Sequence, residues 1–168
     1  MLLTPHTAAG IAIGAAVHNP ILAIPLAFLS HFGLDWIPHW DDVGLGDLRH
    51  SGRLSRRTLR TIILDMLVSL SLLLYFLYWA MPDYGVGMTI IASAFAANLP
   101  DLFYVPMVFL KKRWGWAVWF AKLQSRIQER SRAPLVLGLS LQAFLVAVCS
   151  LIARQEILIR LPKTWQIL

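Results

Sequence analysis

The chain has 168 residues, of which 58% are hydrophobic and 14% are charged, and its mean hydropathy is +0.63. Soluble domains contain about 45–50% apolar and about 25% charged residues, so a water-soluble fold is excluded because it would leave too much apolar surface in water. The 15 Lys and Arg residues outnumber nine acids and give a net charge of +6. Between apolar segments, basic residues indicate cytoplasmic loops and contacts with anionic lipid headgroups, and we expect no nucleic-acid binding.

Five apolar segments follow one another along the chain, which we interpret as a single integral membrane domain over residues 1–168. The segments cover residues 3–17, 20–40, 58–80, 86–110 and 134–153. As a helix, the first extends about 22 Å, which is short of the roughly 30 Å hydrocarbon core. Gly10 and Gly14 lie four residues apart in it. We therefore expect a short re-entrant or tilted helix that packs closely through its glycines.

The other four segments predict spanning helices. Pro20 suits the first position of the helix over 20–40, and Pro25 is expected to kink that helix. The segment 86–110 is interrupted at Asn98-Leu99-Pro100-Asp101. A membrane helix tolerates such a break where its backbone lines a cavity or packs against protein.

Residues 113–130 mix Trp, Phe and Leu with basic residues, a pattern typical of a helix that lies in the membrane interface. The predicted fold class is all-α: a polytopic membrane helix bundle of about four spanning helices, a short re-entrant or tilted N-terminal helix and an interfacial amphipathic helix. Short loops rich in Lys and Arg stay in the cytoplasm, so the stretches 49–60 and 111–132 set the orientation. The predicted location is the cytoplasmic (inner) membrane.

Metal-binding residue types are ordered along one stretch, in which His31, Asp35 and His39 are spaced four residues apart. Positions i and i+4 share a helical face and i+8 is offset by a modest rotation, so one helix edge presents imidazole, carboxylate and imidazole. Both ligand types suit zinc. We favour a metal site over packing alone, because packing seldom produces this order.

The predicted topology brings three further polar residues to the same cytoplasmic depth as this stretch. Asp65 lies soon after Arg60, Asp101 lies less than three turns before Lys111, and His6 returns to that side if the first two segments form a hairpin. A lone acid in a membrane helix costs roughly 2.5–3.5 kcal/mol, so Asp65 needs a partner. Asp65 as structural glue and His6 as an interfacial histidine stay open as alternatives.

The predicted site is a metal centre with more ligands than one tetrahedral ion requires. Its candidate ligands are His6, His31, Asp35, His39, Asp65 and Asp101. One or two zinc ions are expected, with manganese as the alternative. Motifs for a side-chain nucleophile are missing from the sequence, so a metal-activated water is the available nucleophile. Asp65 and His6 are the candidate catalytic residues, as the base or by completing the metal's ligand shell.

Three short motifs lie within about the first 105 residues: Thr4-Pro5-His6, His31-x-x-x-Asp35-x-x-Pro38-His39 and Leu99-Pro100-Asp101. Together they resemble the small inner-membrane metal-dependent hydrolases, a family that has been compared with zinc-dependent phospholipase C. The resemblance implies a helical membrane protein with a His/Asp metal site and hydrolase activity. It carries over every candidate ligand except Asp65, which fits by placement only. Larger members carry a His-Arg-Gly-x-Thr-His motif, which Arg49-His50-Ser51-Gly52 matches only faintly.

The leading hypothesis is a membrane-embedded metal-dependent hydrolase that acts on a phosphoester or phospholipid headgroup at the cytoplasmic leaflet. Basic loops beside the site would attract an anionic substrate, and the expected partners are membrane lipids. A transporter or ion-conducting protein is an alternative, since broken helices and ionisable residues at depth also build transport sites. The third reading is a structural membrane protein with a non-catalytic metal site.

Overall fold

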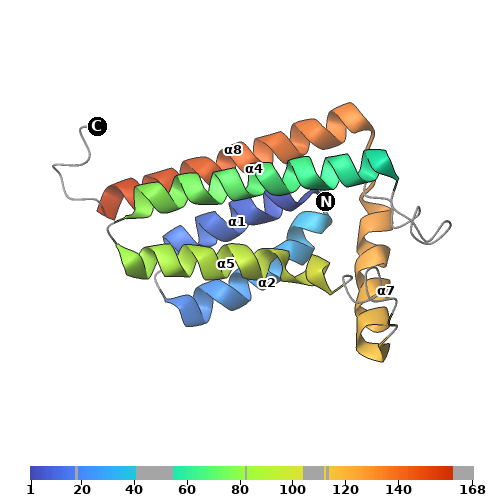
Figure 1. The fold of residues 1–168 in the computed structure, drawn as a ribbon, viewed down its shortest axis with the longest axis horizontal. Helices are drawn as coiled ribbons and strands as arrows, with labels where there is room; N and C mark the ends of the chain where they lie inside the picture. The colour runs from blue at the N-terminus through green and yellow to red at the C-terminus, as the bar shows by residue number, and fades with distance from the viewer. Residues whose placement is uncertain (18, 41–54, 82, 104–111, 113, 161–168) are drawn as a thin grey trace.

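The computed structural model describes residues 1–17, 19–40, 55–81, 83–103, 112 and 114–160. Within them the chain forms six α-helices, which confirms the all-α prediction. They are α1 (Leu3–Ala16), α2 (Pro20–Asp35), α4 (Arg56–Ala80), α5 (Tyr84–Leu102), α7 (Gly115–Arg130) and α8 (Leu135–Arg160). In Figure 1, α4 and α8 run along one side of α1, whereas α2 and α5 pack on its other side. Helix α7 lies across one end of the bundle.

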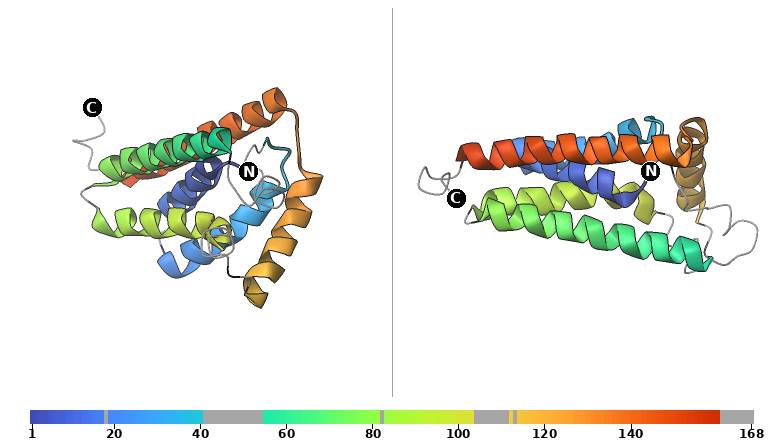
Figure 2. Two further views of the ribbon diagram at one scale, coloured as in Figure 1. Left: turned by 45° about the vertical axis from the view of Figure 1, so that its right-hand side comes forward. Right: turned by 90° about the horizontal axis from the view of Figure 1, so that it is seen from above.

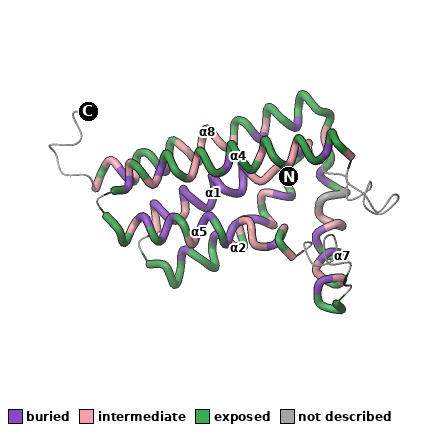
Figure 3. The backbone as a smooth tube through the Cα atoms, viewed as in Figure 1, coloured by how far each residue is buried: buried purple, intermediate pink, exposed green. Residues whose placement is uncertain are grey.

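The short helix α1 forms the centre of the bundle. Eleven of its 14 residues are buried, and it contacts α2, α4, α5 and α8 (Figures 2 and 3). A Cβ atom added at Gly10 would lie 2.6 Å from the Ala94 Cα atom, and one at Gly14 would lie 2.7 Å from the Ile90 Cα atom. The predicted close packing through glycines is therefore confirmed, because only a residue without a side chain lets α1 approach α5 so closely.

Three helices, α4, α5 and α8, are long and apolar enough to cross a membrane, with 25, 19 and 26 residues. Their outer faces carry exposed apolar side chains, among them Leu64 at 63% and Leu151 at 65% exposure. Exposed apolar surface on this scale marks a surface that another apolar phase covers, and for helices of this length that phase is lipid. The chain is therefore a helical membrane protein.

The helix α2 is shorter than the span predicted over 20–40. It begins at Pro20, as expected, with the Asn19 side chain accepting a hydrogen bond from the Ile21 N–H, and it ends at Asp35 after 16 residues. Pro38 disfavours helical backbone at the residue before it, which explains the early end. In the part of the chain that is described, three spanning helices thus stand where the sequence predicted about four.

The predicted interruption of the 86–110 helix is wrong, because α5 runs unbroken to Leu102. Pro100 lies in its last turn, where it removes the bond to the carbonyl four residues earlier, and the helix ends two residues after it. At the far end of the bundle, α8 continues to Arg160, beyond the predicted end at residue 153. The Arg160 guanidinium donates to the Ala15 carbonyl at the end of α1, which satisfies a carbonyl that the helix itself leaves unpaired.

The segment after α2 is fastened to the connection between α7 and α8. The His39 N–H donates to the Ser131 carbonyl and the His39 carbonyl accepts from the Ala133 N–H, both at 2.9 Å. The Gln142 side chain of α8 donates to the Trp40 carbonyl at 2.9 Å. These bonds hold the end of α2 against the end of the bundle where α7 lies.

Candidate metal centre

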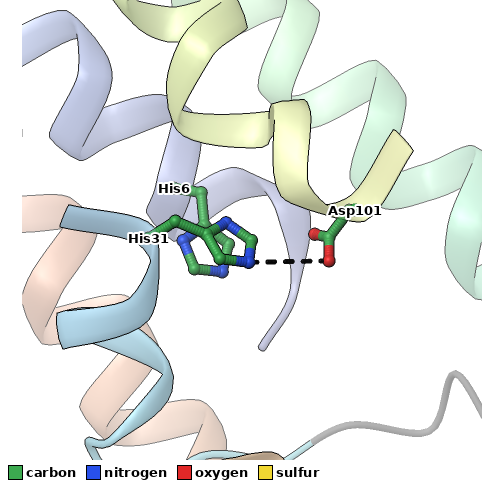
Figure 4. A group of neighbouring side chains, drawn as sticks. All are labelled: His6, His31 and Asp101. Carbon is green, nitrogen blue, oxygen red and sulfur yellow. Dashed lines mark ion pairs between the residues drawn. The ribbon is translucent and has the colours of Figure 1, made fainter. Parts of the chain in front are cut away.

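His6, His31 and Asp101 meet at one point near the end of the bundle (Figure 4). One ligand atom from each lies within 4.8 Å of the others. The two imidazoles are fully buried and stack with centroids 3.9 Å apart and an interplanar angle of 18°. The predicted convergence of these three residues is therefore present in the structure, and a buried group of this composition can hold a metal ion.

Each of these side chains is positioned by a helix end. His6 lies near the start of α1, His31 lies near the end of α2, and Asp101 lies in the last turn of α5. Helices α1 and α2 form the hairpin that the sequence analysis assumed, so His6 returns to the level of His31 (Figure 1).

A backbone hydrogen bond fixes the orientation of the His31 ring. Its Nδ1 atom lies 2.8 Å from the Ala97 carbonyl oxygen, which can only accept, so Nδ1 carries the proton. In the neutral ring the Nε2 lone pair then faces Asp35 Oδ2 at 3.4 Å and Asp101 Oδ1 at 3.7 Å. A lone pair pointing at two carboxylate oxygens is repulsive unless a proton or a cation lies between them.

Asp35 contacts both histidines although it is not one of the three residues whose ligand atoms cluster within 4.8 Å. Its side chain is fully buried, and Oδ1 lies 3.3 Å from His6 Nε2. The amino group of Met1 lies 3.1 Å from the same oxygen. Asp35 can therefore ligate an ion beside His31 Nε2, or it can accept from His6 Nε2 and orient that ring, which is how carboxylates commonly support metal-binding histidines.

His39 is buried beside the bundle end but is not brought into the three-residue group. Its Nδ1 atom lies 2.8 Å from the Ile37 carbonyl oxygen, so Nδ1 donates and the Nε2 lone pair stays available. Burial, followed by the positive charge of the Met1 amino group, lowers the pKa of His39 from its ordinary value of 6.5. The ring is therefore neutral at pH 7, the form in which imidazole binds metals. Its ligand role stays a prediction.

Asp65 has a different environment from the one that a ligand or base would need. Its carboxylate accepts the backbone N–H groups of Leu3 and Thr4 and the Thr4 hydroxyl. These are the first N–H groups of α1, which have no partner within the helix. A carboxylate at a helix N-terminus is stabilised by the helix dipole as well. Asp65 thus has the partner that a lone acid requires, but that partner is the start of α1, through two backbone N–H groups and the Thr4 hydroxyl. The structure does not bring Asp65 into the group of His6, His31 and Asp101.

Unpartnered polar atoms are concentrated around the histidines. Among the described residues, the buried side-chain atoms that lack a hydrogen-bond partner include His6 Nδ1 and Nε2, Asp35 Oδ2, His39 Nε2 and Gln124 Oε1. Each such atom costs about 1–3 kcal/mol if it stays unpaired. Imidazole nitrogens and carboxylate and amide oxygens are the ligands that zinc and manganese take in proteins. The residues present therefore fit a divalent cation.

Gln124 belongs to this site and was not identified from the sequence. It is fully buried on α7, and its Nε2 atom lies 2.6 Å from Asp101 Oδ1 and 3.1 Å from His31 Nε2. The available signal was its spacing from Ala117 and Ala121, which places it on the small, inward face of α7. A neutral amide on such a face does not by itself indicate a metal site.

The other histidines and acids of the first 50 residues, which are His18, His50, Asp41, Asp42 and Asp47, lie outside the described residues. No family model, no curated protein and no solved structure matches this chain. The site therefore rests on its own geometry.

Proposed function

We propose that this protein is a membrane-embedded metal-dependent hydrolase that cleaves a phosphoester of a lipid headgroup, and that it belongs with the inner-membrane metal-dependent hydrolases that its motifs resemble. The observation that carries the proposal is the buried group of His6, His31 and Asp101, with Asp35 in contact with both rings. A divalent ion held there supplies an activated water and polarises a phosphoryl oxygen.

The chain's own residues divide the remaining tasks. Ala97 sets the His31 tautomer that points its lone pair into the site. Asp35 is the carboxylate best placed to hold the ion beside the histidines, because its Oδ2 atom is buried, unpartnered and 3.4 Å from His31 Nε2. We assign neither a ligand nor a base role to Asp65, whose oxygens accept the N–H groups of α1.

The surface beside the site supports a lipid substrate. The exposed face of α7 carries Trp116 and Trp119, at 52% and 64% exposure, together with the exposed bases Lys122 and Arg126. Aromatic rings prefer the membrane interface, and basic side chains attract anionic headgroups. Because α7 also contributes Gln124 to the metal centre, headgroups would reach the protein at the end that holds the site.

The same arrangement supports an orientation in the cytoplasmic membrane. Arg56, Arg57 and Arg60 lie in the first turns of α4, at the end of the bundle that α7 crosses (Figure 1). Positive residues flanking spans favour the cytoplasmic side. We infer that the metal centre faces the cytoplasm. A transport function is not proposed, because α5 is continuous where the sequence predicted a broken helix.

The test is headgroup release from anionic phospholipid vesicles that contain the purified, reconstituted protein. We expect release that requires zinc or manganese, and we expect Asp101→Asn to reduce it to background. Glu156→Gln, which alters a carboxylate near the opposite end of α8, is the matched control and should leave release unchanged. Metal-loaded protein with no release from any vesicle composition would contradict the hydrolase and leave a structural metal site.

A further inference from the structure

The amide of Gln124 lies between two of the three clustered ligand atoms. Its Nε2 atom donates to Asp101 Oδ1 at 2.6 Å. Because Ala97 holds a proton of His31 on Nδ1, Nε2 of the neutral ring is an acceptor, and the second amide hydrogen of Gln124 fills it at 3.1 Å. Without a metal, this amide therefore occupies the two lone pairs that a bound ion would take.

The other end of the same amide has nothing to bind. Gln124 Oε1 is buried and lacks a hydrogen-bond partner within the described residues, although the whole side chain is enclosed. An amide oxygen accepts hydrogen bonds or binds a cation, and it does not donate. Rotation of the amide by about 180° exchanges its oxygen and nitrogen, which differ little in size and shape.

After that rotation, Oε1 would face His31 Nε2 and Asp101 Oδ1, all three of them lone-pair donors. With His31 neutral, such an arrangement is repulsive unless a cation lies among the three atoms. We propose that Gln124 is a metal ligand whose amide holds the empty site together through Nε2 and turns to coordinate the ion through Oε1. This inference rests on the proposed metal centre and adds a ligand from a fourth helix, α7.

The added ligand makes the site depend on α7, the helix that we place in the membrane interface. His6, His31 and Asp101 come from α1, α2 and α5, which pack against one another in the bundle. Gln124 is the contact through which α7 reaches that group. A carbonyl oxygen in the ligand set also favours binding of a harder ion such as manganese beside zinc.

The test measures metal affinity by chelator competition for the full-length wild-type protein and for Gln124→Leu, Gln124→Glu and Ser125→Ala. Ser125 is adjacent on α7 and its hydroxyl bonds only to the Lys122 carbonyl, so Ser125→Ala is the control. We expect Gln124→Leu to bind about 10- to 100-fold more weakly, Gln124→Glu to bind at least as tightly as wild type, and the control to be unchanged.

The sign of the Gln124→Leu effect decides between a ligand and a group that only competes with the ion. Binding as tight as wild type, or tighter, would overturn the inference. If Gln124→Leu does not fold, the metal-induced rise in melting temperature of Gln124→Glu tests the inference instead. A carboxylate in place of a true ligand should also bind the ion, so this rise should be at least equal to that of wild type. A smaller rise overturns the inference. Absence of metal binding by the wild type would instead contradict the proposed function.

Discussion

Asp65 of α4 binds Thr4 of α1 twice, accepting both its backbone N–H at 3.1 Å and its hydroxyl. The contact joins α4, which is exposed on its outer face, to the buried central helix α1. His6 lies two residues after Thr4 on α1, so the contact is close to the metal centre. Asp65 therefore positions the first turn of α1 from outside, as a cap supplied by another helix.

Asp65→Ala should lower the free energy of unfolding by roughly 3 kcal/mol, because it leaves two partly buried N–H groups without an acceptor. Asp65→Asn keeps one acceptor oxygen and should lose less stability. Denaturation in detergent measures both values. Metal content per folded chain should be unchanged in Asp65→Asn, and its loss there would show that Asp65 is a ligand after all.

Gly10→Ala should destabilise the protein by at least about 1–3 kcal/mol, the usual cost of overpacking. The added Cβ would lie 2.6 Å from a backbone atom of α5, which cannot move aside as a side chain can. Gly33→Ala is the matched control, since a Cβ there meets nothing within 4 Å. Gly33 lies in the last turn of α2, where that substitution should be neutral or stabilising by up to about 1 kcal/mol. Equal melting temperatures for the two variants would argue against close packing of α1 on α5.

The proposed orientation predicts opposite labelling of the two bundle ends. In a Cys149→Ala background, Lys122→Cys on α7 should react with an impermeant thiol reagent in inside-out vesicles, and Tyr84→Cys at the start of α5 should react in right-side-out vesicles. Both side chains are exposed, so the membrane alone decides their reactivity. The reverse pattern would place the metal centre on the outer side.

Part of this site could be predicted from the sequence, because basic residues indicate how deep each segment lies in the membrane. Lys and Arg near helix ends set the level of each segment, and that level correctly brought His6, His31 and Asp101 together from three helices. The spacing of His31 and Asp35 correctly placed both on one helical face, with their side chains 3.4 Å apart. These are consequences of helical periodicity and length, which local sequence determines.

Other features depend on contacts between distant segments and could not be predicted in this way. Asp65 binds the start of α1, chiefly through backbone N–H groups that have no side-chain signature in the sequence. Gln124 reaches the site only because α7 lies across the bundle end, a placement set by packing. Pro100 suggested a break within the segment, but α5 continues through it and ends at Leu102, two residues later.

Metal content of the purified wild-type chain, measured by elemental analysis beside His31→Ala and Glu156→Gln, tests the metal centre most directly. We predict about one or two zinc or manganese ions per chain in wild type and in Glu156→Gln, and loss of that metal in His31→Ala. Added metal at about 100 times its dissociation constant should also stabilise the wild type by about 2.7 kcal/mol. Two results together would contradict the metal centre. The wild-type protein would contain no metal after expression in metal-supplemented cells, and its melting temperature would not respond to added zinc or manganese.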